Sequence, residues 1–149
     1  MKKPLVFILN GINLNMFGRR DPAHYGTATL GDIDQRLTEL AGELGLEVEF
    51  FQSNHEGDFV EKIHQIHFSE AAGVIVNAGA WTHYSYGLAD ALAILDVPVV
   101  EVHMSNVHAR EEFRHFSVLS GVVKGSIAGF GVDSYLLALR AVAGLISKR

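Results

Sequence analysis

The 149-residue sequence contains no cysteine, and this absence removes several kinds of chemistry at once. Without cysteine the chain has no disulfide, no thiolate nucleophile and no cysteine-ligated metal site. It is also short of cations, because 12 lysines and arginines face 17 acidic residues and the net charge is -5 at pH 7. Phosphate backbones are bound by basic faces, so this balance argues against nucleic acid as a partner.

Long hydrophobic runs are missing as well. No stretch approaches the roughly 20 apolar residues that cross a bilayer, so we expect no membrane partner. The opening MKKPLVFILNG imitates a signal peptide, but its apolar run, residues 5–9, is too short and no small-residue cleavage site follows. We therefore expect a soluble, cytoplasmic protein. Its hydrophobic content of 48% is enough for one catalytic domain over residues 1–149.

The apolar residues that are present alternate between strand-like runs and helix-like stripes along the chain. The pairs Thr29/Asp32 and Ser53/Glu56 both have the spacing of a helix-capping box. The predicted strands are residues 4–10, 47–52, 73–77, 97–102 and 122–128. The predicted helices are residues 29–44, a segment after Ser53 with Phe59, Ile63 and Ile66 facing inward, residues 84–95, a short helix at 110–116, and residues 132–146.

Five near-continuous apolar strands separated by amphipathic helices predict an α/β fold with one parallel sheet covered on both faces. We expect a flavodoxin-like three-layer sandwich with the strand order 2-1-3-4-5. Such sheets bind ligands beyond the carboxyl ends of the strands, where strands 1 and 3 diverge. Polar residues follow the predicted strands at these ends, namely Asn10 and Asn13, Asn77, and Glu101 with His103. A small-molecule site is therefore expected there.

Four of the seven arginines lie in two short segments, Arg19 with Arg20 and Arg110 with Arg114. This clustering indicates a small anionic ligand held by charge-assisted contacts, although solvated surface arginines would give the same pattern. Two common occupants of the fold do not fit. Asparagines stand where a phosphoacceptor domain has acidic residues, and NGINLN has none of the hydroxyls of an FMN phosphate loop. GFG before the last helix is too little for a dinucleotide fingerprint, so neither nicotinamide nor flavin is expected.

Eight histidines raise the question of a metal site. His83, His103, His108 and His115 fall near the expected site, but the sequence has no HExxH pairing. Glu101 and His103 alternate on one strand, which suits a carboxylate that orients an imidazole as well as it suits two metal ligands. We expect neither a metal nor a cofactor. A metal-dependent hydrolase that uses the histidine cluster and a non-catalytic module that binds small anions both stay open as alternative functions.

Several motifs together resemble type II 3-dehydroquinate dehydratase over nearly the whole chain. They are NGINLN, the segment 18–26, FQSNHEG, NAGAWTH, EVHMSNVHAREEFRH and GFG before the last helix. The resemblance implies the flavodoxin-like fold and the anti elimination of water from 3-dehydroquinate to 3-dehydroshikimate. It also implies no metal or organic cofactor, and a homo-oligomer that is a dodecamer of four trimers. The reaction could serve the shikimate pathway or quinate breakdown.

The resemblance also implies a catalytic role for five residues. Tyr25 would remove the proton at C2, and Arg19 would favour its phenolate, because a phenol with an ordinary pKa of about 10 is a poor base at neutral pH. Asn13 would stabilise the enolate through a water. His103, oriented by Glu101, would protonate the departing C1 hydroxyl.

Further residues are implied as substrate contacts. The backbone at Met104 and Ser105 would hold the substrate carboxylate, and Arg110 would be a lid partner. Glycines on both sides of the Arg19–Tyr25 segment suit a lid that excludes water. The ring hydroxyls and neighbouring groups would meet Asn77, His83 and Arg114, and Asp90 would reach in from an adjacent subunit. The sequence departs from the common pattern at Ile12, usually proline, and at Trp81, Tyr84, Tyr86 and Ala89, which bear on the turn at Asn13 and on the subunit contact.

Overall fold

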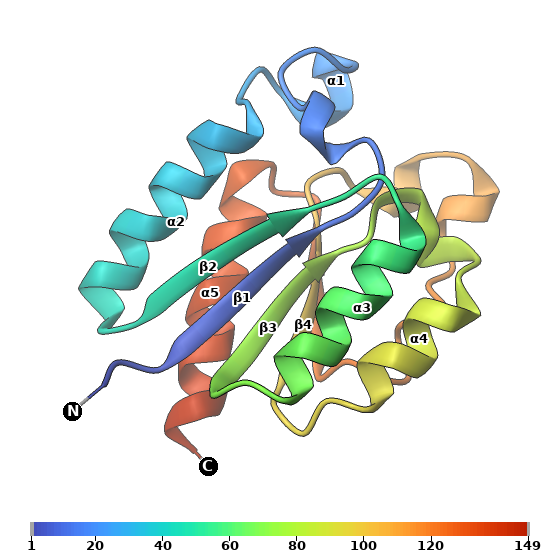
Figure 1. Cartoon of the computed structure of the whole chain (residues 1–149). Coiled ribbons are helices and arrows are strands. Elements are labelled where there is room, and N and C mark those ends of the chain that lie inside the picture. Colours follow the sequence, from blue (N-terminus) through green and yellow to red (C-terminus); the bar gives the residue numbers. More distant parts are fainter. Residues whose placement is uncertain (1, 149) are drawn as a thin grey trace.

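A computed structural model describes residues 2–148 and contains a five-stranded parallel sheet (Figure 1). The strand order is β2-β1-β3-β4-β5, and every neighbouring pair is parallel. The strands are β1 (Leu5–Asn10), β2 (Glu47–Gln52), β3 (Ala71–Asn77), β4 (Val99–His103) and β5 (Gly125–Ala128). The predicted flavodoxin-like topology is confirmed.

Helices cover both faces of this sheet, which makes the three predicted layers. Helices α2 and α5 pack together on one face, while α3 and α4 pack together on the other (Figure 1). The α-helices are α1 (Pro22–Tyr25), α2 (Leu30–Leu44), α3 (Glu56–His67), α4 (Tyr86–Ala93) and α5 (Val132–Ser147). Four 3-10 helices lie among the described residues: η1 (Leu14–Met16), η2 (Gly79–His83), η3 (Val107–Ala109) and η4 (Glu112–Arg114). Within residues 2–148, no helix has the length and apolarity needed to span a bilayer.

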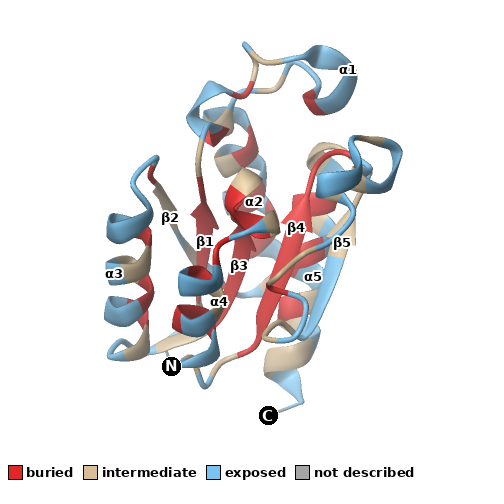
Figure 2. Cartoon of the chain, turned by 90° about the vertical axis from the view of Figure 1, so that its right-hand side faces the viewer, coloured by how far each residue is buried: buried red, intermediate tan, exposed pale blue. Residues whose placement is uncertain are grey.

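The central strands are buried on both sides because successive side chains enter two different cores. Ile8 packs with Ile33 of α2 in one core, and Leu9 packs with Phe59 of α3 in the other. Figure 2 shows this burial along β1, β3 and β4. The polar residues at the carboxyl ends of these strands are therefore anchored by rigid, fully packed elements.

The start of α2 was predicted correctly from its local sequence, and the start of α3 was not. Thr29 and Asp32 form the predicted capping box, with distances of 3.0 and 3.1 Å between side chain and backbone. The second predicted box is wrong, because α3 has His55 as its N-cap and the hydroxyl of Ser53 accepts from the His55 N–H at 2.9 Å. Glu56 instead accepts a hydrogen bond from the Ser85 hydroxyl, which ties α3 to the start of α4.

Two further predictions near the carboxyl end of the chain need correction. The last strand begins at Gly125 rather than at residue 122, because its ladder starts where the Lys124 N–H meets the Val99 carbonyl at 2.7 Å. Val122 and Val123 precede the strand and pack against the α3–α4 core. The short helix expected at 110–116 is replaced by the two separate turns η3 and η4.

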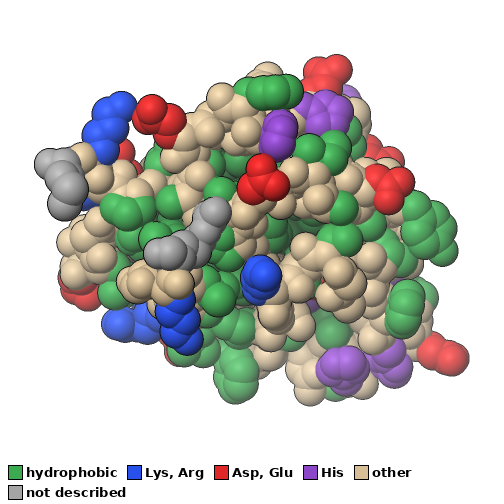
Figure 3. Space-filling view, turned by 90° about the horizontal axis from the view of Figure 1, so that it is seen from below, with side chains coloured by type: hydrophobic (Ala, Val, Ile, Leu, Met, Phe, Trp, Pro, Cys, Tyr) green, Lys and Arg blue, Asp and Glu red, His purple; other side chains and the backbone are tan. Residues whose placement is uncertain are grey.

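Several large hydrophobic side chains remain at the surface. Figure 3, seen from below, shows hydrophobic side chains between mixed acidic, basic and histidine side chains. The most exposed members of the described set, each at least 43% accessible, are Met16, Phe68, Tyr84, Tyr86, Ile94, Phe113, Phe116, Phe130 and Leu137. Tyr84 and Tyr86 flank the start of α4, and Phe113 and Phe116 lie at η4.

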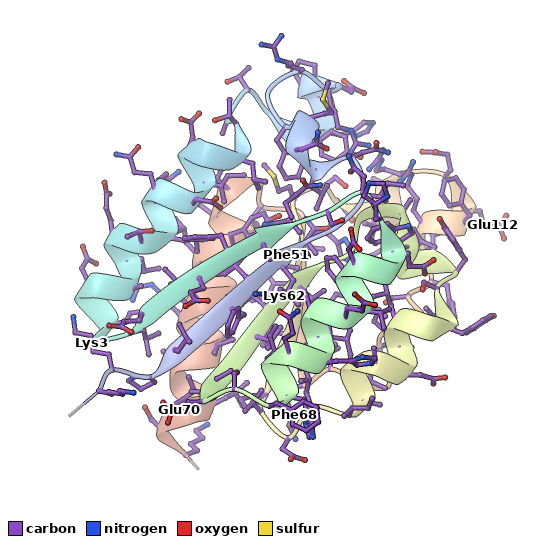
Figure 4. All side chains as sticks on the ribbon, in the orientation of Figure 1. Lys3, Phe51, Lys62, Phe68, Glu70 and Glu112 are labelled. Carbon is purple, nitrogen blue, oxygen red and sulfur yellow. The ribbon has the colours of Figure 1, made fainter. Side chains whose placement is uncertain are left out.

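The edge strand β2 is only half-buried, and a lysine covers part of its surface. Lys62 extends from α3 with its Nζ 5.2 Å from the ring centroid of Phe7 and 5.6 Å from that of Phe51. Figure 4 shows Lys62 and Phe51 next to each other between the sheet and α3. The contact covers the partly buried Phe51 ring with a charge, and a charge beside an edge strand discourages pairing with another strand.

Candidate active site

A cavity lies at the carboxyl ends of β1, β3 and β4, at the place that the fold predicts for a ligand. Its walls come from the loops that follow these strands and from α1, which the sequence did not predict. Nine of the proposed site residues line it: Asn13, Tyr25, Asn77, His83, His103, Met104, Ser105, Arg110 and Arg114. Segments that are far apart in the sequence are thus brought together as expected.

Tyr25 is buried, and its hydroxyl oxygen receives two guanidinium donors. Nη1 of Arg110 lies 2.6 Å from the oxygen and Nη2 of Arg20 lies 3.0 Å from it. The same two guanidinium groups stack near the ring, with their central carbons 5.1 and 4.1 Å from its centroid. Negative charge on the phenolic oxygen would be strongly stabilised by these charge-assisted hydrogen bonds.

Arg20, rather than the predicted Arg19, is the neighbour of Tyr25. Arg19 is exposed and is not among the residues that line the cavity. The chain turns at Gly18, whose φ is +90°, and the turn directs the second arginine of the pair toward α1. An adjacent arginine pair signals a cation at this point of the sequence, but only the turn decides which of the two faces the phenol.

His103 and Glu101 form a buried pair that faces the same side of β4, as their alternation predicts. Nε2 of His103 is 2.6 Å from Oε2 of Glu101, and the Ser117 hydroxyl donates to the other carboxylate oxygen at 3.0 Å. Glu101 is 2% exposed and His103 9% exposed. The carboxylate therefore fixes the imidazole, and Nδ1 is the ring nitrogen left for a ligand in the cavity.

His83 stands against His103, with the ring centroids 6.4 Å apart. Nδ1 of His83 lies 2.8 Å from the carbonyl oxygen of Phe116, which can only accept, so Nδ1 carries a proton. Burial lowers the pKa of His83; the bond to Phe116 opposes this, while the charges of His103 and Arg114 add to it. At neutral pH His83 is therefore a neutral imidazole with Nε2 free to accept.

Asn13 is held in a left-handed conformation with a φ of +69°. Its N–H donates to Oδ1 of Asn54 at 2.8 Å, and Nε2 of Gln52 donates at 3.2 Å to that same oxygen and to the Gly11 carbonyl. Gln52 is the last residue of β2, the strand next to β1, and Asn54 follows it, so both support the loop from the side. Both residues belong to the FQSNHEG motif, but the sequence alone did not indicate a function for either of them.

Glycine is required where the loops after β1 and β3 touch. A Cβ at Gly11 would lie 2.6 Å from the Ala78 carbonyl oxygen, and one at Gly79 would lie 2.7 Å from that of Ile12. The two backbones therefore meet in direct contact beneath the cavity. Ile12 forms the other side of the Gly79 contact, through its backbone and its Cγ2.

Three other proposed residues differ in their surroundings. Arg114 donates through Nε to both carboxylate oxygens of Glu111 at 3.2 Å while still lining the cavity. Ser105 accepts from Nη1 of Arg110 at 3.2 Å, so its hydroxyl helps to position that cation. Asp90 is exposed on α4 and lies outside the cavity of its own chain.

Across residues 2–148 the structure has no group of three or more histidine, aspartate or glutamate side chains placed to hold a metal ion.

The fold and the cavity at its strand ends define an α/β protein of the flavodoxin-like class, with a buried histidine–glutamate pair and an arginine-bound tyrosine at the cavity. A family model described as dehydroquinase class II matches residues 4–143. A 3-dehydroquinate dehydratase of Syntrophotalea carbinolica is 66% identical over 98% of this chain and 97% of its own, and one of Pelobacter propionicus is 63% identical over 99% and 97%. A solved type II dehydroquinase from Propionibacterium acnes superposes with a TM-score of 0.92 at 46% identity, covering 95% of this chain and 97% of that one.

The chain therefore belongs to the type II 3-dehydroquinate dehydratases, which are hydro-lyases. This confirms the resemblance drawn from the motifs.

Proposed function

We propose that the cavity catalyses a cofactor-free anti elimination of water from 3-dehydroquinate through an enolate, giving 3-dehydroshikimate. The observation that carries this mechanism is the buried Tyr25 hydroxyl, which two guanidinium groups contact at 2.6 and 3.0 Å. A base of this kind needs its anion stabilised, and the cavity supplies that stabilisation from its own side chains.

In the first step, the Tyr25 phenolate takes the proton from C2 of the substrate. The C–H electron pair becomes the C2–C3 double bond of the enolate, and the C3 ketone oxygen takes the negative charge. Arg20 and Arg110 favour the phenolate before the transfer. Asn13, held by Asn54, supplies a hydrogen bond to the enolate oxygen through a water.

In the second step, the enolate electrons form the C1–C2 double bond while the C1–O bond breaks. His103 donates its proton to the departing hydroxyl, which leaves as water. Glu101 stabilises the imidazolium before the transfer and keeps the ring aligned after it. A proton then passes from Tyr25 back to His103 by way of solvent, which restores both groups.

The substrate is held by the remaining residues of the cavity. The carboxylate rests on the backbone N–H groups at Met104 and Ser105, and Asn77, neutral His83 and Arg114 contact the ring hydroxyls and neighbouring groups. Arg110 lines the same cavity and donates a hydrogen bond to Tyr25, the last residue of α1. Through this contact the α1 segment can act as a lid over the bound substrate.

We further propose that residues 1–149 form one catalytic domain that works in the cytoplasm as a dodecamer of four trimers. The exposed aromatic side chains of α4 and η4, beside the exposed Asp90, support a subunit contact at this edge of the site. Asp90 would then complete the cavity of the adjacent subunit. The same dehydration is a step of the shikimate pathway and of quinate breakdown, and the proposed mechanism is the same for both.

The decisive experiment adds 3-dehydroquinate to the purified protein after exhaustive EDTA treatment and follows the absorbance of the enone product. We expect full activity, because acid, base and oxyanion donor are all side chains of the chain. The Tyr25→Phe variant is the matched control and should give almost no signal. Activity that EDTA removes and zinc restores would favour a metal-dependent enzyme, and a bound but unchanged substrate would favour a binding module.

A further inference from the structure

Tyr135 of α5 lies behind the active-site cavity without lining it, and it is completely buried. Its hydroxyl sits between two asparagines that are direct neighbours across β1 and β3, Asn10 and Asn77. The oxygen is 2.8 Å from Nδ2 of Asn77 and 2.6 Å from Oδ1 of Asn10. A chain of hydrogen bonds thus runs from the cavity wall through the sheet to the helix behind it.

The direction of every hydrogen bond in this chain follows from one backbone donor. The Gly79 N–H points at Asn77 with a distance of 3.2 Å, so the amide oxygen Oδ1 of Asn77 must face it. The amide nitrogen then faces Tyr135, whose oxygen accepts and whose proton is donated to Asn10. One Nδ2 proton of Asn77 is left over for a ligand.

The phenol of Tyr135 keeps its proton throughout the working range of pH. Burial raises the pKa of Tyr135, the Asn77 hydrogen bond opposes this rise, and the negative charge of Asp34 adds to it. Tyr135 is therefore a permanent donor toward Asn10 and a permanent acceptor toward Asn77. Two buried phenols in one protein thus have opposite surroundings, because guanidinium groups contact Tyr25 and neutral amides contact Tyr135.

We propose that Tyr135 is a positioning residue of the dehydratase, which holds the Asn77 amide in the one orientation that presents an N–H to the substrate. The inference rests on the proposed contact between Asn77 and the substrate. Without the phenolic oxygen, the amide nitrogen loses its buried acceptor, and only the 3.2 Å bond from the Gly79 N–H still holds the amide. The amide can then rotate and offer a substrate hydroxyl an acceptor where it needs a donor.

The test is a double-mutant cycle on the steady-state kinetics of 3-dehydroquinate dehydration. Tyr135→Phe keeps the ring that fills the core and removes only the oxygen. We expect KM to rise about 3- to 10-fold, the loss of one neutral hydrogen bond, with kcat changed by less than about threefold. Asn77→Ala should raise KM by itself, and adding Tyr135→Phe to it should raise KM no further, because both changes act on the same contact.

Ser134→Ala is the matched control, since it removes a buried hydroxyl one residue away on α5 that accepts from the Phe130 N–H at 2.9 Å. It should lower the melting temperature as Tyr135→Phe does but leave KM unchanged. KM effects of Tyr135→Phe and Asn77→Ala that multiply would overturn the inference, because Tyr135 would then act by another route.

Two other outcomes separate this inference from the proposed function. A raised KM in Asn77→Ala with a normal KM in Tyr135→Phe overturns the role of Tyr135 and leaves the substrate contact of Asn77 standing. An unchanged KM in Asn77→Ala overturns both. Should Tyr135→Phe fail to fold, Asn10→Ala removes the acceptor at the far end of the chain. The Tyr135 hydroxyl then turns its proton toward Asn77, and the same rise in KM is expected.

Discussion

At the scale of single residues, the chemistry depends on what surrounds the Tyr25 hydroxyl. A phenol is an ordinary side chain whose acidity is too weak for base catalysis at neutral pH, with a pKa of about 10 in water. The two guanidinium donors turn this particular phenol into a candidate base. The sequence predicted Arg19 as the cation beside this phenol, and the structure places Arg20 and Arg110 there instead.

Tyr25→Phe tests the base directly. The substitution removes one oxygen and leaves the ring packed against Phe17, 5.7 Å away between centroids, so the fold should persist. General-base catalysis contributes about 10²–10⁴-fold, and kcat should fall by at least that range. KM should change little, because Asn77, His83 and Arg114 remain. Turnover near the normal rate in this variant would make Tyr25 a substrate contact only.

Comparing Arg20→Ala with Arg19→Ala tests the corrected assignment. Arg20→Ala removes a cation 3.0 Å from the phenolic oxygen, so kcat should fall by about 10- to 100-fold, the loss of one charge-assisted hydrogen bond. Arg19 is exposed, and its substitution should change kcat less than about twofold. The reverse ranking of the two variants would restore the original assignment.

At the scale of secondary structure elements, helix α2 carries two aspartates with opposite effects on stability. Hydrogen bonds from the Thr29 backbone and hydroxyl lower the pKa of Asp32 at the start of the helix. Burial raises the pKa of Asp34 to about 6, and its Oδ1 has no hydrogen-bond partner among the described residues. The charged form is thus favoured in the fold at one position and disfavoured at the other.

The pH dependence of unfolding should separate these two carboxyl groups. Asp34 is protonated in both states well below the unfolded pKa of 3.8, so it has no effect there. As the pH rises from 3.8 to about 6 the unfolded state loses this proton more readily, so the folded state is progressively destabilised, and the full penalty is reached above about pH 6. Asp34→Asn should therefore raise the melting temperature by on the order of 2–4 °C at pH 8 and by almost nothing at pH 4. Thermal unfolding followed by circular dichroism at both pH values measures this difference.

Asp32→Asn is the matched control with the opposite sign. Its charge stabilises the folded state above the ordinary carboxyl pKa, and this contribution is lost as the pH falls. The variant should melt lower than the wild type at pH 8 and close to it in acid. If Asp34→Asn raised the melting temperature equally at both pH values, the charge of the Asp34 carboxyl would not be the cause of the destabilisation.

At the scale of the whole molecule, two features indicate an assembly of several chains. The mean hydropathy of +0.19 is high for a small monomer, and large aromatic side chains remain exposed at α4 and η4. We expect the protein to sediment as a large closed assembly rather than at 16.3 kDa. A fully active monomer at high dilution would contradict both this assembly and the role of Asp90.

Complementation between inactive variants tests Asp90 itself. If Asp90 acts in the cavity of a neighbour, co-expressed Tyr25→Phe and Asp90→Ala chains form mixed oligomers in which some sites hold an intact Tyr25 and an intact Asp90. Random mixing should restore about a quarter of the wild-type activity. Each variant assembled alone is the control and should stay inactive. Mixed oligomers that also remain inactive would show that Asp90 is needed in its own chain rather than in the cavity of a neighbour, and an active Asp90→Ala variant would place it outside the reaction.

Much of this protein is determined by local sequence. The spacing of apolar residues specifies five buried strands with helices between them, because period 2 and period 3.6 put different residues on one face. Thr29, Asp32 and Gly45 mark the ends of α2 through their own side-chain or backbone properties. Once the strands are parallel, their carboxyl ends meet at one edge, so the sequence alone also located Asn77, Glu101 and His103 at a common site.

Tertiary structure decided the contacts that depend on orientation rather than position. Glu56 was spaced to cap its own helix, yet it accepts from Ser85 because α3 and α4 pack side by side. Arg20 reaches Tyr25 only because the chain turns at Gly18. Tyr135 contacts Asn77, 58 positions away in sequence, because α5 packs across β3 and β4. The spacing of residues along the chain carries no information about such contacts. The direction of a side chain across a packed interface depends on both of the elements that form it.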